Sequence, residues 1–325
     1  CVEQSVTVYF AGVIRMQIKT KNRIRSVCVS IARFVFLLGV AYIILYPLLY
    51  MLSMAFRPTS QVDDPTVVWI PRSLTLDVIK ETFTMMKYLP ALKNTALLSI
   101  VSSLISVIVC AFVGYGFARF EFPLKNILFF GVVLTILVPV QTILIPMVTT
   151  MRYFDFFYIG QLGRLFGGEP WTVNLMNTPF AMYVPATFAS GVRAGLFIFI
   201  YRQFFLGAPR ELEDAAYIDG CGPVKTMLKV MLPLARGAIV IVLLFSVVSY
   251  WNEEFYTTFF YNNLSTLRTA LLGVEGRATE LYRNGNIAVA FKQAGALLYM
   301  APPLLFFIIF QRLFTESIER TGIVG

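Results

Sequence analysis

Residues 95–118 read TALLSIVSSLISVIVCAFVGYGFA and contain no charged side chain. An α-helix rises about 1.5 Å per residue, so a helix of this length crosses the roughly 30 Å hydrocarbon core of a bilayer. The whole chain of 325 residues is 58% hydrophobic and only 14% charged. A soluble protein of this length needs more charge to cover its surface. The sequence therefore predicts an all-α membrane protein.

Six apolar segments of this kind follow one another, and we expect each to form a transmembrane helix. An even number of spans places both termini on the same side of the membrane. Six lysines and arginines precede the first span, and this enrichment is typical of cytoplasmic flanks. We therefore expect one membrane domain (34–313) with spans at 34–56, 95–118, 126–151, 178–205, 234–260 and 288–310, between a cytoplasmic segment (1–33) and a cytoplasmic tail (314–325).

The residue types exclude most enzymatic chemistry. The chain has no histidine, which removes histidine acid–base catalysis, histidine-activated nucleophiles and most zinc or iron sites. The four cysteines are far apart and are expected to be inert. The net charge of +9 comes from residues that lie between apolar runs, which favours anionic lipid over nucleic acid as their partner. We expect no catalytic residue, no metal site and no cofactor.

The fourth expected span is irregular because it contains prolines, glycines and an arginine. Pro179, Pro185, Gly191 and Gly195 predict a kinked or discontinuous helix. Arg193 costs about 2.5–3.5 kcal/mol at membrane depth unless it faces a cavity or a partner. One interpretation places Arg193 on a translocation path. The alternative starts a helix near Gly195, with Arg193 at the outer interface.

The fifth and third expected spans also carry polar side chains. Glu253 and Glu254 are adjacent in SYWNEEF, so they point about 100° apart on a helix and cannot converge on one bond. They mark either the outer end of the helix or a polar lining, in which Trp251 and Asn252 suit stacking on and hydrogen bonding to a sugar-like solute. Gln141 in the third span needs other helices or a water-filled path as its partner.

A stretch at residues 211–234, ELEDAAYIDGCGPVKTMLKVMLPL, resembles a phosphate-binding loop at first sight. That loop requires glycine immediately before its lysine, so that backbone amides close on the phosphates. Here Val224 precedes Lys225, and a β-branched side chain lacks the conformational freedom of glycine. The sequence therefore predicts no nucleotide site in this chain.

The same stretch predicts two short helices joined by a tight turn. Gly220 ends the first helix, Pro223 begins the second, and Pro233 breaks the chain before the fifth span. A bulky residue at Gly220 is expected to prevent the turn from closing. Such a helical pair can dock into a groove of a partner, or rest on its own bundle or on lipid headgroups. Its expected apolar face consists of Val224, Met227, Leu228 and Met231.

This stretch resembles the EAA loop of ATP-binding-cassette importer permeases, whose pattern is EAA, three residues, G, nine residues, then I-x-L-P. The matching pieces elsewhere are YPLLYMLSMAFRP, YGFARFEFP, VPVQTILIP, RQFFLGAPRELEDAA, SYWNEEF and ERTGIVG. They are similar to the carbohydrate-importer branch, and within it to the smaller maltose-type permease. The chain departs from this branch in a longer outer segment (155–177) and in a tail without lysine. The matching loop positions are Asp214, Ala215, Ala216, Gly220, Val230, Leu232 and Pro233.

The resemblance implies a permease subunit of a binding-protein-dependent importer of sugars or oligosaccharides in the bacterial cell membrane. Its partners would be a second permease, two ATPase subunits that hydrolyse the ATP, and an extracytoplasmic solute-binding protein. Segment 206–233, between spans four and five, would be the cytoplasmic coupling loop. Its ATPase-coupling residues would be Glu213, Asp214, Ala215, Ala216, Asp219, Gly220 and Pro233. The candidate path residues are Gln141, Arg193, Trp251, Asn252 and Glu253.

Two other functions compete with this one. A stand-alone secondary transporter of small polar solutes is expected to have inverted repeats and intramembrane acids for ion coupling, and neither is evident. A membrane enzyme is disfavoured by the missing histidines, metal spacings and nucleophile motifs.

Overall fold

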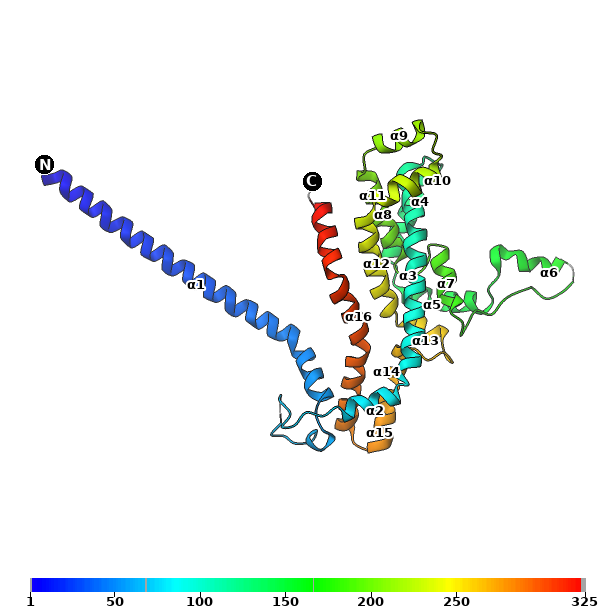
Figure 1. Cartoon of the computed structure of the whole chain (residues 1–325), viewed down its shortest axis with the longest axis horizontal. Coiled ribbons are helices and arrows are strands. Elements are labelled where there is room, and N and C mark those ends of the chain that lie inside the picture. The colour runs from blue at the N-terminus through cyan, green and yellow to red at the C-terminus, as the bar shows by residue number, and fades with distance from the viewer. Residues whose placement is uncertain (1, 68, 166, 323–325) are drawn as a thin grey trace.

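The computed structural model describes residues 2–67, 69–165 and 167–322 (Figure 1). Cys1 and residues 323–325, the end of the expected tail, lie outside the described residues. Over the described ranges the chain is helical, with one isolated antiparallel bridge between Phe154 and Val173. The elements are α1 (Val2–Ala55), η1 (Thr59–Gln61), α2 (Asp77–Met85), α3 (Tyr88–Arg119), α4 (Lys125–Leu137), α5 (Val140–Arg152), η2 (Phe156–Gln161), α6 (Leu162–Leu165), α7 (Phe180–Thr187), α8 (Ala194–Gly207), α9 (Glu211–Ile218), α10 (Pro223–Thr226), η3 (Met227–Met231), α11 (Leu232–Leu234), α12 (Arg236–Trp251), α13 (Phe255–Phe260), α14 (Leu267–Leu272), α15 (Val274–Tyr282) and α16 (Gly285–Gly322).

Three described helices have the length and composition of a membrane span: α1 from Ser26 onward, α3, and α16 as far as Arg312. Two bent pairs, α4 with α5 and the stretch Pro223–Leu234 with α12, raise the number of candidate spans to five. The expected fourth span is divided between α7 and α8, and α8 is a shorter apolar helix. The structure thus confirms an all-helical membrane protein.

The third expected span is not one continuous helix. The segment expected over 126–151 is divided into α4 and α5, whose axes meet at 105°. Val138, immediately before Pro139, is extended, with φ −73° and ψ 121°. The ring of a proline disfavours the helical conformation of the preceding residue, and proline has no N–H to continue the helix. The expectation of an uninterrupted span was therefore wrong at Pro139.

The two terminal helices extend beyond the expected boundaries. The expected cytoplasmic segment and the first span form one helix, α1, which diverges from the other helices over most of its length in Figure 1. Between Ser26 and Leu49 the side chains of α1 are exposed. At the other end, α16 continues past the sixth expected span into the expected tail.

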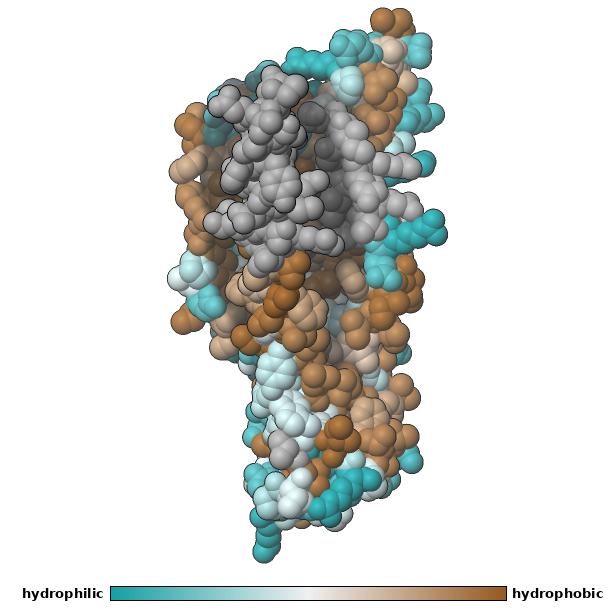
Figure 2. Space-filling model, turned by 90° about the vertical axis from the view of Figure 1, so that its left-hand side faces the viewer, coloured by the Kyte–Doolittle hydropathy of each residue, from teal (hydrophilic) through white to brown (hydrophobic). Residues whose placement is uncertain are grey.

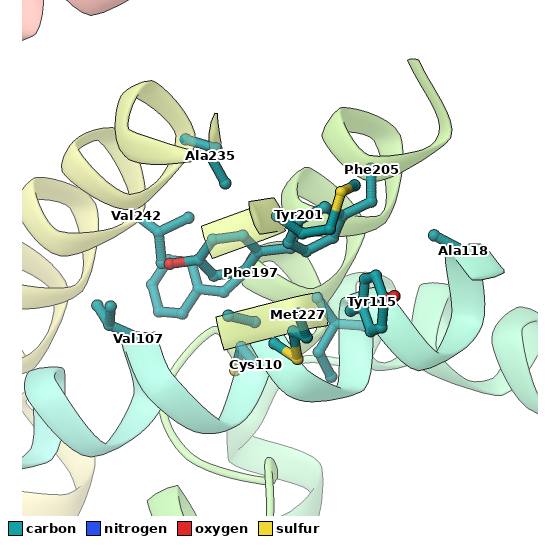
Figure 3. Packing of buried hydrophobic residues seen from close by; sticks show 14 of the residues in the cluster. Val107, Cys110, Tyr115, Ala118, Phe197, Tyr201, Phe205, Met227, Ala235 and Val242 are labelled. Carbon is teal, nitrogen blue, oxygen red and sulfur yellow. The ribbon is translucent and has the colours of Figure 1, made fainter. Parts of the chain in front are cut away.

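The largest buried cluster lies around α3, which packs against α8, α12 and η3 (Figure 3). Figure 2 shows apolar side chains along much of the length of the molecule and hydrophilic ones gathered mainly towards its two ends. Gly114 permits the closest approach of α3 to α8, because a Cβ atom at this position would lie 2.6 Å from Cβ of Tyr201. The buried side chains labelled in Figure 3 are Val107, Cys110, Tyr115, Ala118, Phe197, Tyr201, Phe205, Met227, Ala235 and Val242.

Candidate functional site

Helices α9 and α10 form a projection at the end of the molecule opposite α2 and α15 (Figure 1). We call residues 206–233 the coupling segment. Three acidic side chains lie in the first turn of α9, where the positive end of the helix dipole stabilises them. The helix ends at a left-handed glycine, Gly220, with φ +77°. The N–H of Gly220 donates to the carbonyl of Tyr217, and the N–H of Cys221 donates to that of Ala216. This pair of hydrogen bonds is the Schellman motif that commonly terminates helices.

The space around Gly220 is open. No heavy atom lies within 4 Å of the position that a Cβ atom would take there. Crowding at the Cβ position is therefore not the reason for a glycine here. The requirement for glycine comes from the positive φ angle, which disfavours L-residues with a side chain.

The apolar face expected on the second helix of the segment is only half covered. Met227 and Met231 are buried against the α3–α8 core, whereas Val224 and Leu228 are exposed. Pro233 lies in α11, which continues η3 without a gap, so the helical stretch ends shortly after the proline and not at it. The break follows at Ala235, and the axes before and after it differ by 80°.

The seven expected ATPase-coupling residues fall into two groups. Glu213 and Ala216 are buried, and Glu213 accepts a hydrogen bond from Nε of Arg119 at 2.9 Å. The other five are exposed: Asp214, Ala215, Asp219, Gly220 and Pro233.

Sequence analysis missed two features of the coupling segment. Arg119 was not recognised as a partner of Glu213, although it ends the apolar run of α3 and was therefore the first cation available at that boundary. The exposed apolar side chains of α9 were also missed. Ile218, for example, is 86% exposed at the end of α9. Leu212 and Tyr217 of α9 are exposed as well, as are Val224 and Leu228 on the second helix of the segment.

The candidate path residues lie at helix breaks. Arg193 is an exposed left-handed residue directly before α8, which begins at Ala194, next to the helix start expected near Gly195. Glu253 lies between α12 and α13, and its Oε1 accepts from the N–H of Phe255 at 3.0 Å. The charge of Arg193 acts electrostatically on the Glu253 carboxylate, and a Cβ atom at Gly191, two residues before Arg193, would clash with the hydroxyl of Tyr250, three residues before Glu253. The structure therefore brings together the breaks in the fourth and fifth expected spans. Gln141 lies apart from this pair in sequence and is exposed at the start of α5, just after the 105° bend.

Trp251 and Asn252 have different environments. Trp251 is buried and packs beside Tyr299, with ring centroids 6.3 Å apart, so its indole faces are not open to a solute in this conformation. Asn252 is exposed, and its Oδ1 lies 3.4 Å from the hydroxyl of Tyr299.

Comparison with known proteins identifies relatives over most of the chain. Residues 106–320 match a family described as the binding-protein-dependent transport system inner membrane component. The arabinooligosaccharides transport system permease protein AraQ of Halalkalibacterium halodurans is 27% identical over 289 residues, which cover 88% of this chain and 93% of AraQ. The maltodextrin transport system permease protein MdxG of Bacillus subtilis is 25% identical over 318 residues, which cover 95% of this chain and 100% of MdxG.

A crystal structure of a bacterial ABC transporter involved in the import of the acidic polysaccharide alginate contains a chain of the same fold. The TM-score is 0.66 with 18% identity, over 88% of this chain and 96% of that one. The family match covers well over half of the chain and includes the whole coupling segment and both helix breaks at Arg193 and Glu253. The protein is thus a multi-pass membrane component without catalytic chemistry of its own, and it belongs to the family of binding-protein-dependent transport system inner membrane components, the permease subunits of ABC importers.

Proposed function

We propose that this permease imports sugars or oligosaccharides as one half of a heteromeric ABC importer. The relatives named for arabino-oligosaccharide, maltodextrin and trehalose transport support this solute class, because they align with 86–95% of the chain. The partners are a second, related permease, two ATPase subunits and an extracytoplasmic solute-binding protein.

The coupling segment is the surface on which an ATPase subunit docks. The observation that carries this assignment is an exposed apolar surface on a projecting helical pair, because isolated projections of this kind favour burial in a partner's groove. Asp214 and Asp219 are exposed on this segment, as are Lys225 and Lys229, so it presents both signs of charge to a partner. Charges at a rim determine orientation and partner choice more than affinity.

In the proposed topology the coupling segment and both termini are cytoplasmic. Six spans then arise from α1, α3, α4 with α5, α7 with α8, α12 with α13, and α16. Breaks within a span are tolerated where the freed backbone faces protein or a water-filled cavity rather than lipid. The breaks beside Arg193 and Glu253 are therefore proposed to line the solute path together with Asn252 and Gln141, while Trp251 supports them by packing.

Reconstitution tests the function directly. The permease pair is placed in lipid vesicles with its ATPase subunits and binding protein, and uptake of labelled arabino-oligosaccharides, maltodextrins and trehalose is measured with and without ATP. ATP-dependent uptake that requires the binding protein supports the proposal. Uptake by this chain without the ATPase subunits would instead identify a secondary transporter, and ATP-dependent uptake of none of these sugars would refute the solute class.

A further inference from the structure

A single guanidinium group joins the ends of three helices at the base of the coupling segment. Arg119 is the last residue of α3. Its Nε donates to Oε1 of Glu213, in the first turn of α9, at 2.9 Å. Its Nη2 donates to the carbonyl oxygen of Ala208, directly after α8, at 2.8 Å. Arg119 and Glu213 are 94 residues apart in the sequence, so the contact connects α3 to the coupling segment without any local backbone link.

The Arg119–Glu213 pair is withdrawn from water. The two side chains are only 6% and 8% exposed. Salt screens a buried pair much less than an exposed one, and removal of one partner leaves an uncompensated charge. The arrangement also matches the helix dipoles, since the cation lies at the C-terminus of α3 and the anion at the N-terminus of α9. The guanidinium additionally satisfies one of the carbonyl groups that the end of α8 leaves without a helical partner.

At its other end, α3 is bonded to the opposite side of the molecule. Nδ2 of Asn94 donates to the carbonyl of Ser265, and the N–H of Leu267 donates to Oγ1 of Thr95, each at 2.8 Å. A helix of 32 residues is about 48 Å long at about 1.5 Å per residue. One straight element therefore connects Arg119 to the loop and helix that carry Ser265 and Leu267.

We infer that the Arg119–Glu213 ion pair is the joint through which a displacement of α9 moves α3 and, with it, the far end of the bundle. This inference rests on the proposed docking of an ATPase on the coupling segment. Without the pair, α9 keeps its backbone link to α8, and Met227 and Met231 keep their packing on the core. The segment then stays folded and docked, and η3 keeps its packing on α3, so what is lost is the ion pair that ties α9 itself to α3. Glu213 is thus a positioning residue that acts through Arg119 rather than an ATPase contact.

The test uses the complete importer in lipid vesicles, with labelled arabino-oligosaccharides and maltodextrins as the transport probe. Glu213→Gln keeps the shape of the side chain and removes its charge. We expect it to lower the amount of solute taken up per ATP hydrolysed by about 5- to 150-fold, the usual range of coupling between sites, with unchanged co-purification of the ATPase subunits. Arg119→Lys retains the positive charge but loses the forked guanidinium that donates to both Glu213 and the carbonyl of Ala208. Its uptake per ATP hydrolysed should therefore lie between the values of the unmodified importer and of Glu213→Gln.

The matched control is the ion pair between Lys125 and Glu121, at 3.0 Å, in which the carboxylate partner Glu121 is 85% exposed and Lys125 is 13% exposed. Glu121→Gln should leave the ratio of uptake to hydrolysis unchanged. ATP-dependent uptake by the unmodified importer tests the proposed function. The solute taken up per ATP hydrolysed by each variant, compared with that of the unmodified importer, tests the joint. A wild-type ratio in Glu213→Gln overturns the inference.

A second variant separates coupling from assembly. Cysteines replace Arg119 and Glu213 in a chain whose other cysteines are serine, and a bis-methanethiosulfonate cross-linker of matching span forms a reducible disulfide with each cysteine and releases methanesulfinate. Restoration of coupling by the link, and its loss on reduction, supports a mechanical joint. The inference is refuted if the linked importer remains uncoupled. It is also refuted if neither variant assembles with its ATPase subunits, because the pair then serves folding.

Discussion

The left-handed turn at Gly220 leads to a prediction whose magnitude follows from its geometry. Gly220 has φ +77° and open space around it, so alanine meets no steric obstacle beyond its own backbone. An L-residue in the left-handed region costs about 1–2 kcal/mol relative to glycine, and at about 1.4 kcal/mol per factor of ten this is a 5- to 30-fold change in an equilibrium. Apparent affinity falls in proportion to the population of the binding-competent conformation, so Gly220→Ala should weaken ATPase binding by at most about 30-fold.

Gly222 supplies the matched control. It lies two residues further on, has φ −76° and ψ 170°, and also has no heavy atom within 4 Å of a Cβ position. Gly222→Ala should therefore leave binding nearly unchanged. The loss of affinity in Gly220→Asn should lie between the losses in Gly222→Ala and Gly220→Ala, because asparagine tolerates the left-handed region better than alanine does.

Titration of the purified ATPase subunit onto the permease pair in lipid nanodiscs measures the affinities directly. The thermal unfolding midpoint of each variant checks that the bundle is intact, since the turn lies outside the core. Equal effects of Gly220→Ala and Gly222→Ala would refute the reasoning, because only one of the two positions requires a positive φ. Weakening by Gly220→Asn as large as that by Gly220→Ala would point to the side chain at the docking surface instead of the backbone.

Three further predictions concern packing, pH and the helix breaks. Gly114→Val should destabilise the bundle by about 1–3 kcal/mol, because its Cβ would lie 2.6 Å from that of Tyr201; a lowered thermal midpoint in detergent is the expected result. The hydroxyl of Tyr282 donates to Glu81 at 2.6 Å, and burial together with this carboxylate raises the pKa of Tyr282 to about 12. The hydrogen bond of Tyr282 contributes its full stabilisation below pH 10, the ordinary pKa of tyrosine, and this stabilisation is lost as the pH rises through the folded-state pKa of about 12. The thermal midpoints of wild type and Tyr282→Phe should therefore differ by a constant amount below pH 10 and converge above it. Arg193→Gln should change transport rate or solute affinity without loss of assembly, and a double-mutant cycle with Glu253→Gln should be non-additive; strict additivity would mean that the two groups do not interact.

Local sequence patterns predicted much of the coupling segment. The acidic first turn of α9, the glycine at its end and the proline that begins α10 each act through their own backbone or through neighbours within one turn. Such signals do not depend on what the segment packs against. The same holds for the discontinuity of the fourth expected span, where prolines and glycines interrupt the helical hydrogen bonds whatever surrounds them.

The orientation of individual side chains could not be predicted in this way. Glu213 and Asp214 are neighbours with the same chemistry, yet one is buried against Arg119 and the other is exposed. Trp251 is buried although its position beside Asn252 suggested a solute-lining role. These outcomes depend on which face of each helix meets a segment many residues away, as the separation of Arg119 and Glu213 illustrates.

The sequence by itself determined that the chain is a helical membrane protein with two short helices between its fourth and fifth apolar segments. Hydrophobic composition and local backbone preferences are properties of short stretches, so they can be read from one chain without its fold. Only the tertiary structure decided that α3 is bonded to the coupling segment through a buried ion pair, that the third expected span bends by 105°, and that the break before α8 lies beside the end of α12. Those features depend on contacts between distant segments, whose free energy becomes favourable only when the whole bundle has packed.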